Sequence, residues 1–271
     1  LSWRIESDEQ NVIQTAYHIL VASSPELLEQ GKGDIWDSGK IESDASQWIT
    51  YQGKTLKCNA SYYWKVKIDT NKGATNWSAP AFWTTGLFNE ADWQGQWIGL
   101  DRAAPGDSET QWSRLAARYL RKEFAVKKSV KRATVHIAGM GLYELFINGQ
   151  RIGNQVLAPA PTDYRKTILY NTYDVTPQLR KENAIGVTLG NGRFYTMRQN
   201  YKPYKIPTFG YPKLRLNLIV EYMDGSKETI ATNTSWKLTT EGPIRSNNEY
   251  DGEEYDARKE LGAWTQTGYD D

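Results

Sequence analysis

The chain has 271 residues, more than one small β domain needs and enough to form two hydrophobic cores. Its 33 Lys and Arg residues balance 32 Asp and Glu residues, so charge gives no reason to expect a nucleic acid or an anionic membrane as a partner. The single cysteine, Cys58, excludes an intrachain disulfide and any Cys-based zinc site. No apolar run approaches the roughly 20 residues that a membrane-spanning helix requires.

Short strands separated by turns are predicted in residues 1–87. The segment 15–23 (TAYHILVAS) alternates between two faces, and Pro25 opens one short helical turn. This pattern indicates an all-β sandwich. Further strands are expected at 35–36, 47–51, 61–70 and 81–85.

A more specific pattern lies around Tyr62, which is followed by apolar residues at every second position, Trp64, Val66 and Ile68. It resembles the strand of fibronectin type III domains that carries a tyrosine corner, in which the Tyr hydroxyl bonds to the preceding backbone. Cys58 stands where that family often has Pro. We therefore interpret residues 1–87 as a fibronectin III-like β-sandwich, for which a spacer is the simplest role.

Residues 88–114 form the joint to a second domain. Trp93 and Trp97 are four residues apart, which predicts that they share one side of a helical turn and pack into a seam between the domains. The segment 101–113 is polar and contains Pro and Gly, as exposed loops do.

Residues 115–265 return to the β pattern and predict a jelly-roll (galactose-binding-like) β-sandwich, after which 266–271 begin a linker. About eight strands are expected, at 119–126, 133–137, 142–147, 167–174, 183–189, 213–223, 227–232 and 236–240. Two long loops, 157–166 and 190–211, are of the length that usually serves function or docks against a neighbour.

The segment 133–154 looks like the organising element of this second domain. It predicts two half-buried strands bent at Gly139 and Gly141, and Asn148-Gly149 supplies a tight turn that sends 150–152 back along the preceding strand. We interpret it as the central hairpin of the sandwich. A second hairpin turn is predicted at Asp224-Gly225.

Catalytic chemistry finds little support in the motifs. The two histidines, His18 and His136, both fall in strand patterns, which argues against a Ser-His-Asp or Cys-His site. The acidic stretch 247–256 fails as an EF-hand because Arg258 occupies the position of the bidentate Glu. Neighbouring carboxylates on one strand or turn rarely face each other across a cleft, so we favour a structural or docking role for this stretch.

Several segments together resemble the N-terminal region of bacterial α-L-rhamnosidases of glycoside hydrolase family 78. In the first domain these are TAYHILVASS, WDSGKIES and SYYWKVK. In the second domain they are 145–149, 161–164, 172–175, 189–192 and 242–258. The resemblance implies a parent enzyme that removes terminal α-L-rhamnose with inversion and whose catalytic acid and base lie in an (α/α)-barrel.

That barrel needs several hundred residues with many amphipathic helices, and nothing in this sequence looks like it. We therefore expect a non-catalytic N-terminal fragment without catalytic residues. The expected partners are L-rhamnose-containing glycosides or polysaccharide and the fragment's own missing barrel. An exported, periplasmic or extracellular location is favoured over the cytoplasm.

The resemblance also suggests a sugar-binding surface. Some related jelly rolls are similar to family 67 carbohydrate-binding modules, which hold rhamnose through a calcium ion gripped by Asp and Asn. Here no Asp-Asn pair accompanies Asp163, so we predict no metal and keep calcium as an alternative. Hydrogen bonding and ring stacking to a sugar are assigned to six candidates: Asp163, Tyr164, Asn191, Arg193, Tyr195 and Tyr250.

Three alternatives stay open. The candidate loops are equally suited to packing on the missing barrel without touching sugar. The chain also fits a stand-alone lectin-like carbohydrate-binding module or an adhesion protein, because fold alone does not settle function.

Overall fold

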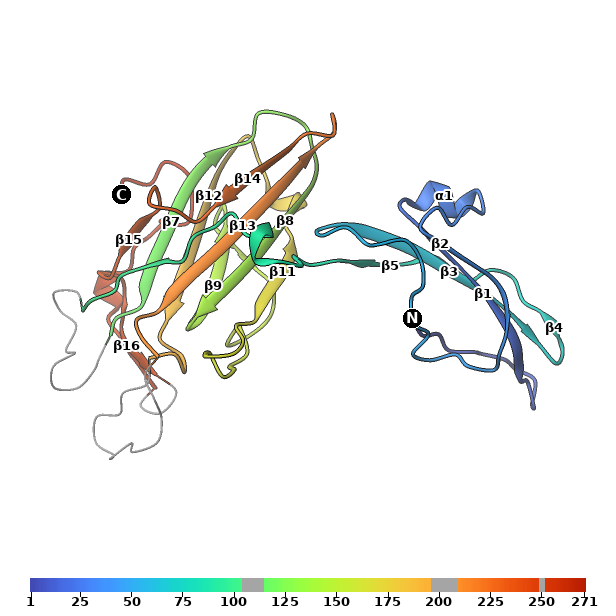
Figure 1. The fold of residues 1–271 in the computed structure, drawn as a ribbon. Coiled ribbons are helices and arrows are strands. Elements are labelled where there is room, and N and C mark those ends of the chain that lie inside the picture. The colour runs from blue at the N-terminus through green and yellow to red at the C-terminus, as the bar shows by residue number, and fades with distance from the viewer. Residues whose placement is uncertain (104–114, 196–208, 249–251) are drawn as a thin grey trace. The chain divides into compact units, whose positions relative to one another are not determined.

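The computed structural model describes residues 1–103, 115–195, 209–248 and 252–271. These residues form two compact units, Leu1–Asp92 and Trp93–Asp271. Nearly all of the regular structure is β (Figure 1), which confirms the predicted fold class. None of the described helices has the length and apolar character needed to cross a membrane.

The first unit contains one antiparallel sheet with the order β2-β1-β3-β4, and β5 pairs with β3. Its single α-helix, α1 (Pro25–Glu29), begins where predicted, since the Ser24 hydroxyl accepts from the Leu27 amide at 3.4 Å. The strands are β1 (Gln14–Ala22), β2 (Trp36–Glu42), β3 (Ser61–Thr70), β4 (Gly73–Ala74) and β5 (Ala81–Thr84).

The strand expected at 47–51 does not form. Trp48 has a φ of 58°, which interrupts extended geometry, and Ile49 instead exchanges backbone hydrogen bonds with Leu1. Apolar side chains of these extended segments pack on the core of the first unit, which contains Ile19, Val21, Tyr62, Val66 and Ile68. The segment therefore covers the sheet without adding a strand to it.

The tyrosine corner is confirmed. The Lys57 amide donates to the Tyr62 hydroxyl at 2.7 Å, and the ring of Tyr62 is buried at the entry to β3. Thr85 closes the same corner, because its hydroxyl donates to the Lys57 carbonyl at 2.6 Å and accepts from the Ala60 amide at 3.0 Å.

The second unit is a sandwich of two five-stranded antiparallel sheets plus a two-stranded hairpin, β16-β17. One sheet has the order β10-β9-β12-β7-β15, and the other has β11-β8-β13-β14 with β6 on β13. The strands are β6 (Ile98–Gly99), β7 (Arg118–Ala125), β8 (Val130–Met140), β9 (Leu142–Ile147), β10 (Gln150–Ile152), β11 (Tyr170–Asp174), β12 (Glu182–Gly190), β13 (Lys213–Tyr222), β14 (Lys227–Ala231), β15 (Lys237–Thr239), β16 (Ile244–Asn248) and β17 (Gly252–Tyr255).

Three short 3-10 turns complete the regular structure of the described residues: η1 (Glu90–Asp92), η2 (Thr176–Gln178) and η3 (Ala257–Lys259). The single core of the second unit lies between its two sheets, where alternate residues of β8, β9, β12 and β13 are fully buried.

The segment 133–154 is wrong as a central hairpin, although its strands and turns are present. β8 and β9 belong to opposite sheets, so the chain crosses the sandwich at Gly141, whose φ is 130°. The predicted Asn148-Gly149 hairpin is confirmed, with φ values of 52° and 81° and with β10 paired antiparallel to β9, but β10 is an edge strand and so the hairpin is not central. The Asp224-Gly225 hairpin is confirmed between β13 and β14.

The helical turn expected to hold Trp93 and Trp97 ends before them, at Asp92. The backbone continues extended because the Gly95 amide donates to Asn217 Oδ1 at 2.8 Å and the Gly95 carbonyl accepts from Arg215 at 2.6 Å. Both indole rings lie over the Arg215 guanidinium, at 5.1 and 6.0 Å. Their partner is therefore β13 of the second unit.

His136 is fully buried. Its Nδ1 lies 2.9 Å from the Thr172 hydroxyl, and burial together with the nearby Arg132 charge lowers its pKa from 6.5 to about 4. The protonated imidazolium is thus disfavoured in the folded state, whereas the unfolded chain takes up the proton near pH 6.5.

We expect Tyr62→Phe to destabilise the first unit by about 1–3 kcal/mol, because the partly buried hydrogen bond from the Lys57 amide loses its acceptor at the buried Tyr62 ring. Tyr51→Phe is the matched control, since its hydroxyl bonds to Lys54 at an exposed site where water can replace it. Urea unfolding followed by tryptophan fluorescence measures both. Equal losses from the two variants would contradict a special role for the corner.

We expect the second unit to lose stability as the pH falls from 6.5 to about 4, by up to about 3 kcal/mol from His136 alone. The sign follows from a folded pKa below the unfolded one: both states are neutral at high pH, and only the unfolded state gains the proton in this window. His136→Gln keeps a side chain able to bond Thr172 and should flatten this part of the profile. Urea unfolding midpoints of both proteins at pH 7.5, 6, 5 and 4 test this. The same dependence of the midpoint on pH in His136→Gln as in the unaltered chain would refute it.

Candidate functional site

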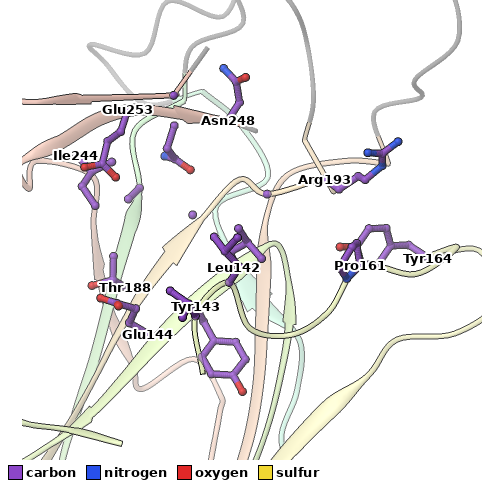
Figure 2. Close-up of a pocket in the computed structure, with 17 residues that line it drawn as sticks. Leu142, Tyr143, Glu144, Pro161, Tyr164, Thr188, Arg193, Ile244, Asn248 and Glu253 are labelled. Carbon is purple, nitrogen blue, oxygen red and sulfur yellow. The ribbon is translucent and has the colours of Figure 1, made fainter. Parts of the chain in front are cut away.

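A pocket of about 670 Å³ opens at one end of the second sandwich, where β9 begins, β12 ends and the β16-β17 hairpin lies alongside. In the view of Figure 2, Arg193, Pro161 and Tyr164 lie on one side of it, and Ile244, Glu253 and Thr188 lie on the other. Leu142 and Tyr143 lie between these two groups. Segments from five separate parts of the sequence, including Ala117 before β7, therefore share this pocket.

The turn 190–192 shapes the floor. A Cβ on Gly141 would lie 2.2 Å from the carbonyl oxygen of Gly190, and a Cβ on Gly190 would lie 2.8 Å from Asn247 Oδ1. Gly141 has to be glycine because the contact is with backbone and its φ is 130°, whereas a side chain at Gly190 would force the Asn247 side chain to shift. Gly190 and Gly192 both line the pocket as a result.

Asn191 lies between these glycines and is buried, with 2% of its surface exposed. Its Nδ2 donates to the carbonyls of Leu115 and Asn247, at 3.0 and 2.8 Å, and its amide donates to Asn247 Oδ1 at 2.6 Å. Asn191 Oδ1 has no hydrogen-bond partner among the described residues. The side chain therefore ties the turn to β16 from beneath the pocket.

Two of the six candidates, Tyr164 and Arg193, line the pocket. The Tyr164 ring meets the ring of Phe194 edge-on at 5.2 Å and that of Phe209 at 5.3 Å, so its position is fixed by aromatic packing. The Arg193 side chain is exposed. The pocket thus combines a guanidinium and a phenol from loops that are 29 residues apart in sequence.

The other candidates have different surroundings. Asp163 forms a two-point ion pair with Arg165, at 2.9 and 3.2 Å, and this hydrogen bonding lowers the pKa of the carboxyl. Tyr195 is buried and stacks on Tyr211 at 5.8 Å. Neither Asp163 nor Tyr195 lines the pocket. Tyr250 lies outside the described residues.

The six sugar-binding candidates do not include several polar lining residues, namely Glu144 and Thr188, and also Asn247, Asn248 and Glu253 of the acidic stretch for which the sequence favours a structural or docking role. Asn247, Asn248 and Glu253 come from the β16-β17 hairpin, whose strands lack the apolar alternation by which strands are recognised. The one local signal was Asp251-Gly252, a turn pair in the acidic stretch, and Gly252 has a φ of 78°.

The lining suits a polyol. Amide, hydroxyl, guanidinium and carboxylate groups alternate with the apolar side chains of Leu142, Val156, Leu157 and Pro161, which matches the mixed polar and C–H surface of a sugar ring. Neither histidine lines the pocket. Within the described ranges, no group of three or more His, Cys, Asp or Glu residues is placed to hold a metal ion.

Asp256, at the end of the acidic stretch, is engaged locally. It forms a two-point ion pair with Arg258, with both contacts at 2.8 Å, and this hydrogen bonding lowers the pKa of the carboxyl to about 2. Arg258, which occupies the position of the bidentate Glu in an EF-hand, is thus the ion-pair partner of Asp256.

We expect Asn191→Ala to destabilise the second unit by about 2–3 kcal/mol, because it removes the Asn191 hydrogen bonds to the Leu115 and Asn247 carbonyls and leaves Leu115 with only the longer bond from Asn247 Nδ2, at 3.4 Å. Asn233→Ala is the control, since Asn233 is exposed and bonds only within its own turn to Ser235. Urea unfolding of the two variants provides the measurement. A loss below about 0.5 kcal/mol at Asn191 would show that its hydrogen bonds do not hold the pocket floor.

Comparison with known proteins agrees with this architecture. Residues 128–271 match the family described as the alpha-L-rhamnosidase N-terminal domain, and residues 1–89 match the Rha78A-like N-terminal immunoglobulin domain. An alpha-L-rhamnosidase of Formosa agariphila is 40% identical over 290 residues, which covers 100% of this chain and 30% of that protein. An Alteromonas alpha-L-rhamnosidase is 35% identical and is covered to the same extent.

The solved structures that resemble this chain over its full length are also alpha-L-rhamnosidases. The alpha-L-rhamnosidase from Dictyoglumus thermophilum matches with a TM-score of 0.89 and 41% identity, covering 100% of this chain and 30% of that one. The Streptomyces avermitilis alpha-L-rhamnosidase complexed with L-rhamnose matches with a TM-score of 0.83 and 25% identity, over 100% of this chain and 42% of that one. Nothing in these matches supports the stand-alone lectin alternative.

The chain therefore spans about a third of the length of the relatives it matches, and the family description assigns residues 128–271 to the N-terminal domain of such proteins. The match to this family covers residues 128–271, more than half of the chain, and the chain therefore belongs to the alpha-L-rhamnosidase N-terminal domain family.

Proposed function

We propose that this chain serves an α-L-rhamnosidase that removes terminal α-L-rhamnose with inversion, and that it acts there as a scaffold for a separate catalytic (α/α)-barrel. The observation that carries the proposal is the match of the whole chain to the N-terminal third of such enzymes. In the described residues the only α-helix has five residues, far from a toroid of long helices. Export from the cytoplasm stays a prediction.

We further propose that the pocket at the 190–192 turn binds L-rhamnose or a rhamnose-containing glycan. Arg193 supplies two parallel donors for neighbouring hydroxyls, Asn247 and Asn248 supply amides, and Tyr164 supplies an aromatic surface. Support comes from the fixed position of the Tyr164 ring and from the tied floor beneath it. Calcium is not needed for this set of contacts.

The proposal is tested by calorimetric titration of the chain with L-rhamnose, in calcium and in chelator. We expect binding that is the same in both, because the lining supplies donors and acceptors without a metal. Arg193→Ala should weaken binding by about tenfold or more, the cost of one charge-assisted hydrogen bond. Arg165→Ala is the control, because Arg165 is exposed, pairs with Asp163 and does not line the pocket.

Each outcome has a clear meaning. Binding that requires calcium would replace the metal-free pocket with a metal site. No binding under either condition would leave the scaffold role alone. Hydrolysis of an aryl α-L-rhamnoside by the 271-residue chain would contradict its non-catalytic assignment.

A further inference from the structure

A second cleft, of about 950 Å³, lies at the other end of β12 from the pocket. Glu182, the first residue of β12, lines the cleft, and Gly190, the last, lines the pocket. A strand of this length separates its ends by roughly 26 Å, so the two sites are distinct. The walls of the cleft are the turn from β7 to β8 and the loop that leads into β12.

Positive charge is concentrated on both walls. Lys127 and Lys128 come from the β7–β8 turn, Arg180 and Lys181 come from the loop before β12, and Glu182 is the single carboxylate among the lining residues. Lys128 is neutralised by Asp224, with Nζ 2.8 Å from the carboxylate. None of the ion pairs among the described residues involves Lys127, Arg180 or Lys181. Three uncompensated cations therefore face one cleft in a chain whose net charge is only +1.

The loop that carries Arg180 and Lys181 is held rigidly. Asn183 is fully buried, and its side chain both accepts from the Arg180 amide and donates to the Arg180 carbonyl, each at 2.7 Å. Asn148, in the β9–β10 turn, donates to Asn183 Oδ1 and to the Gln178 carbonyl, both at 2.9 Å. The backbone therefore cannot move easily to separate the two cations.

The opposite wall is tied as well. The Val126 amide donates to the Lys181 carbonyl at 2.8 Å, which links the two walls directly. The Met223 amide donates to the Ser129 carbonyl at 2.9 Å, and Lys128 bonds to Ser226 at 2.9 Å. Like charges held in place on a fixed backbone repel one another, and an anion bound between them relieves that repulsion.

We propose that this basic cleft, defined by Lys127, Arg180 and Lys181, binds the acidic groups of an anionic polysaccharide. The remaining lining offers hydroxyls from Ser129 and Thr176 and aliphatic surface from Val130 and Leu179, which suit the polar and C–H faces of sugar units. None of the described residues that line the cleft is aromatic, and aromatic rings are the stacking platforms with which proteins hold single-stranded nucleic acid.

The choice of a glycan as the polyanion rests on the proposed function, because a rhamnosidase acts on glycans. Carboxylated and sulfated sugars share the chemistry that the cleft recognises. The cleft therefore anchors an acidic stretch of the glycan at one end of the sandwich, while the rhamnose pocket lies at the other.

The test measures binding of the chain to polygalacturonate, to dextran sulfate and to neutral dextran at 20, 100 and 300 mM NaCl. We expect binding to one or both acidic polymers, none to dextran, and affinity that falls as salt rises. The triple variant Lys127→Glu, Arg180→Glu, Lys181→Glu should bind at least about tenfold more weakly, because each exposed contact contributes modestly and three are lost.

The matched control is Lys32→Glu, Lys54→Glu, Lys57→Glu, which makes the same change in net charge at exposed lysines of the first unit. Equal weakening in both triples, no binding to either acidic polymer, or equally tight binding of a duplex DNA would overturn the proposal. Titration of the cleft triple with L-rhamnose separates the two proposals. If the triple variant retains rhamnose binding and loses binding to the acidic polymers, both proposals are supported. If the unaltered chain binds an acidic polymer but not L-rhamnose, only the cleft proposal stands.

Discussion

The close approach of Gly141 to Gly190 is the constraint on which the functional end of the second unit depends. Each residue lies where a side chain would strike backbone or an Asn amide, at 2.2 and 2.8 Å. With glycine at both places, β8 crosses to β9 in the opposite sheet directly beside the end of β12. That proximity brings the 190–192 turn, the start of β9 and the β16-β17 hairpin together, and the pocket is the space they leave between them.

Buried asparagines hold the loops at both ends of the second unit in place through hydrogen bonds to the backbone. Asn191 ties the pocket floor to β16, Asn183 holds the loop of the basic cleft, and Asn217 holds the extended segment through Gly95. An amide side chain carries both donors and an acceptor, so one buried residue can satisfy several backbone groups of a loop that has no strand partner. Both clefts, at the two ends of β12, therefore rest on backbones that buried hydrogen bonds hold in place.

Ion pairs among the described residues join distant positions, such as Lys128 with Asp224, and also near neighbours. Asp163 with Arg165 and Asp256 with Arg258 are pairs two residues apart, formed at once by local geometry and used up there. The charges that face the pocket and the basic cleft instead come from segments distant in sequence, such as Arg193 with Glu253 around the pocket. A charge that is paired with a neighbour in the sequence, as Asp163 is with Arg165, is less available to a ligand.

The sequence by itself determined the all-β class, most strands, the Tyr62 corner, the Asp-Gly and Asn-Gly turns and the family, because alternation, turn residues and motif spacing are local properties. Only the tertiary structure decided that β8 and β9 lie in opposite sheets, that Trp93 and Trp97 pack on Arg215, and that the polar β16-β17 hairpin walls the pocket. These depend on contacts between segments far apart in the chain, which local patterns do not encode. The same reason explains why Tyr164 and Arg193 meet at the pocket while Tyr195, equally prominent in sequence, is buried in packing.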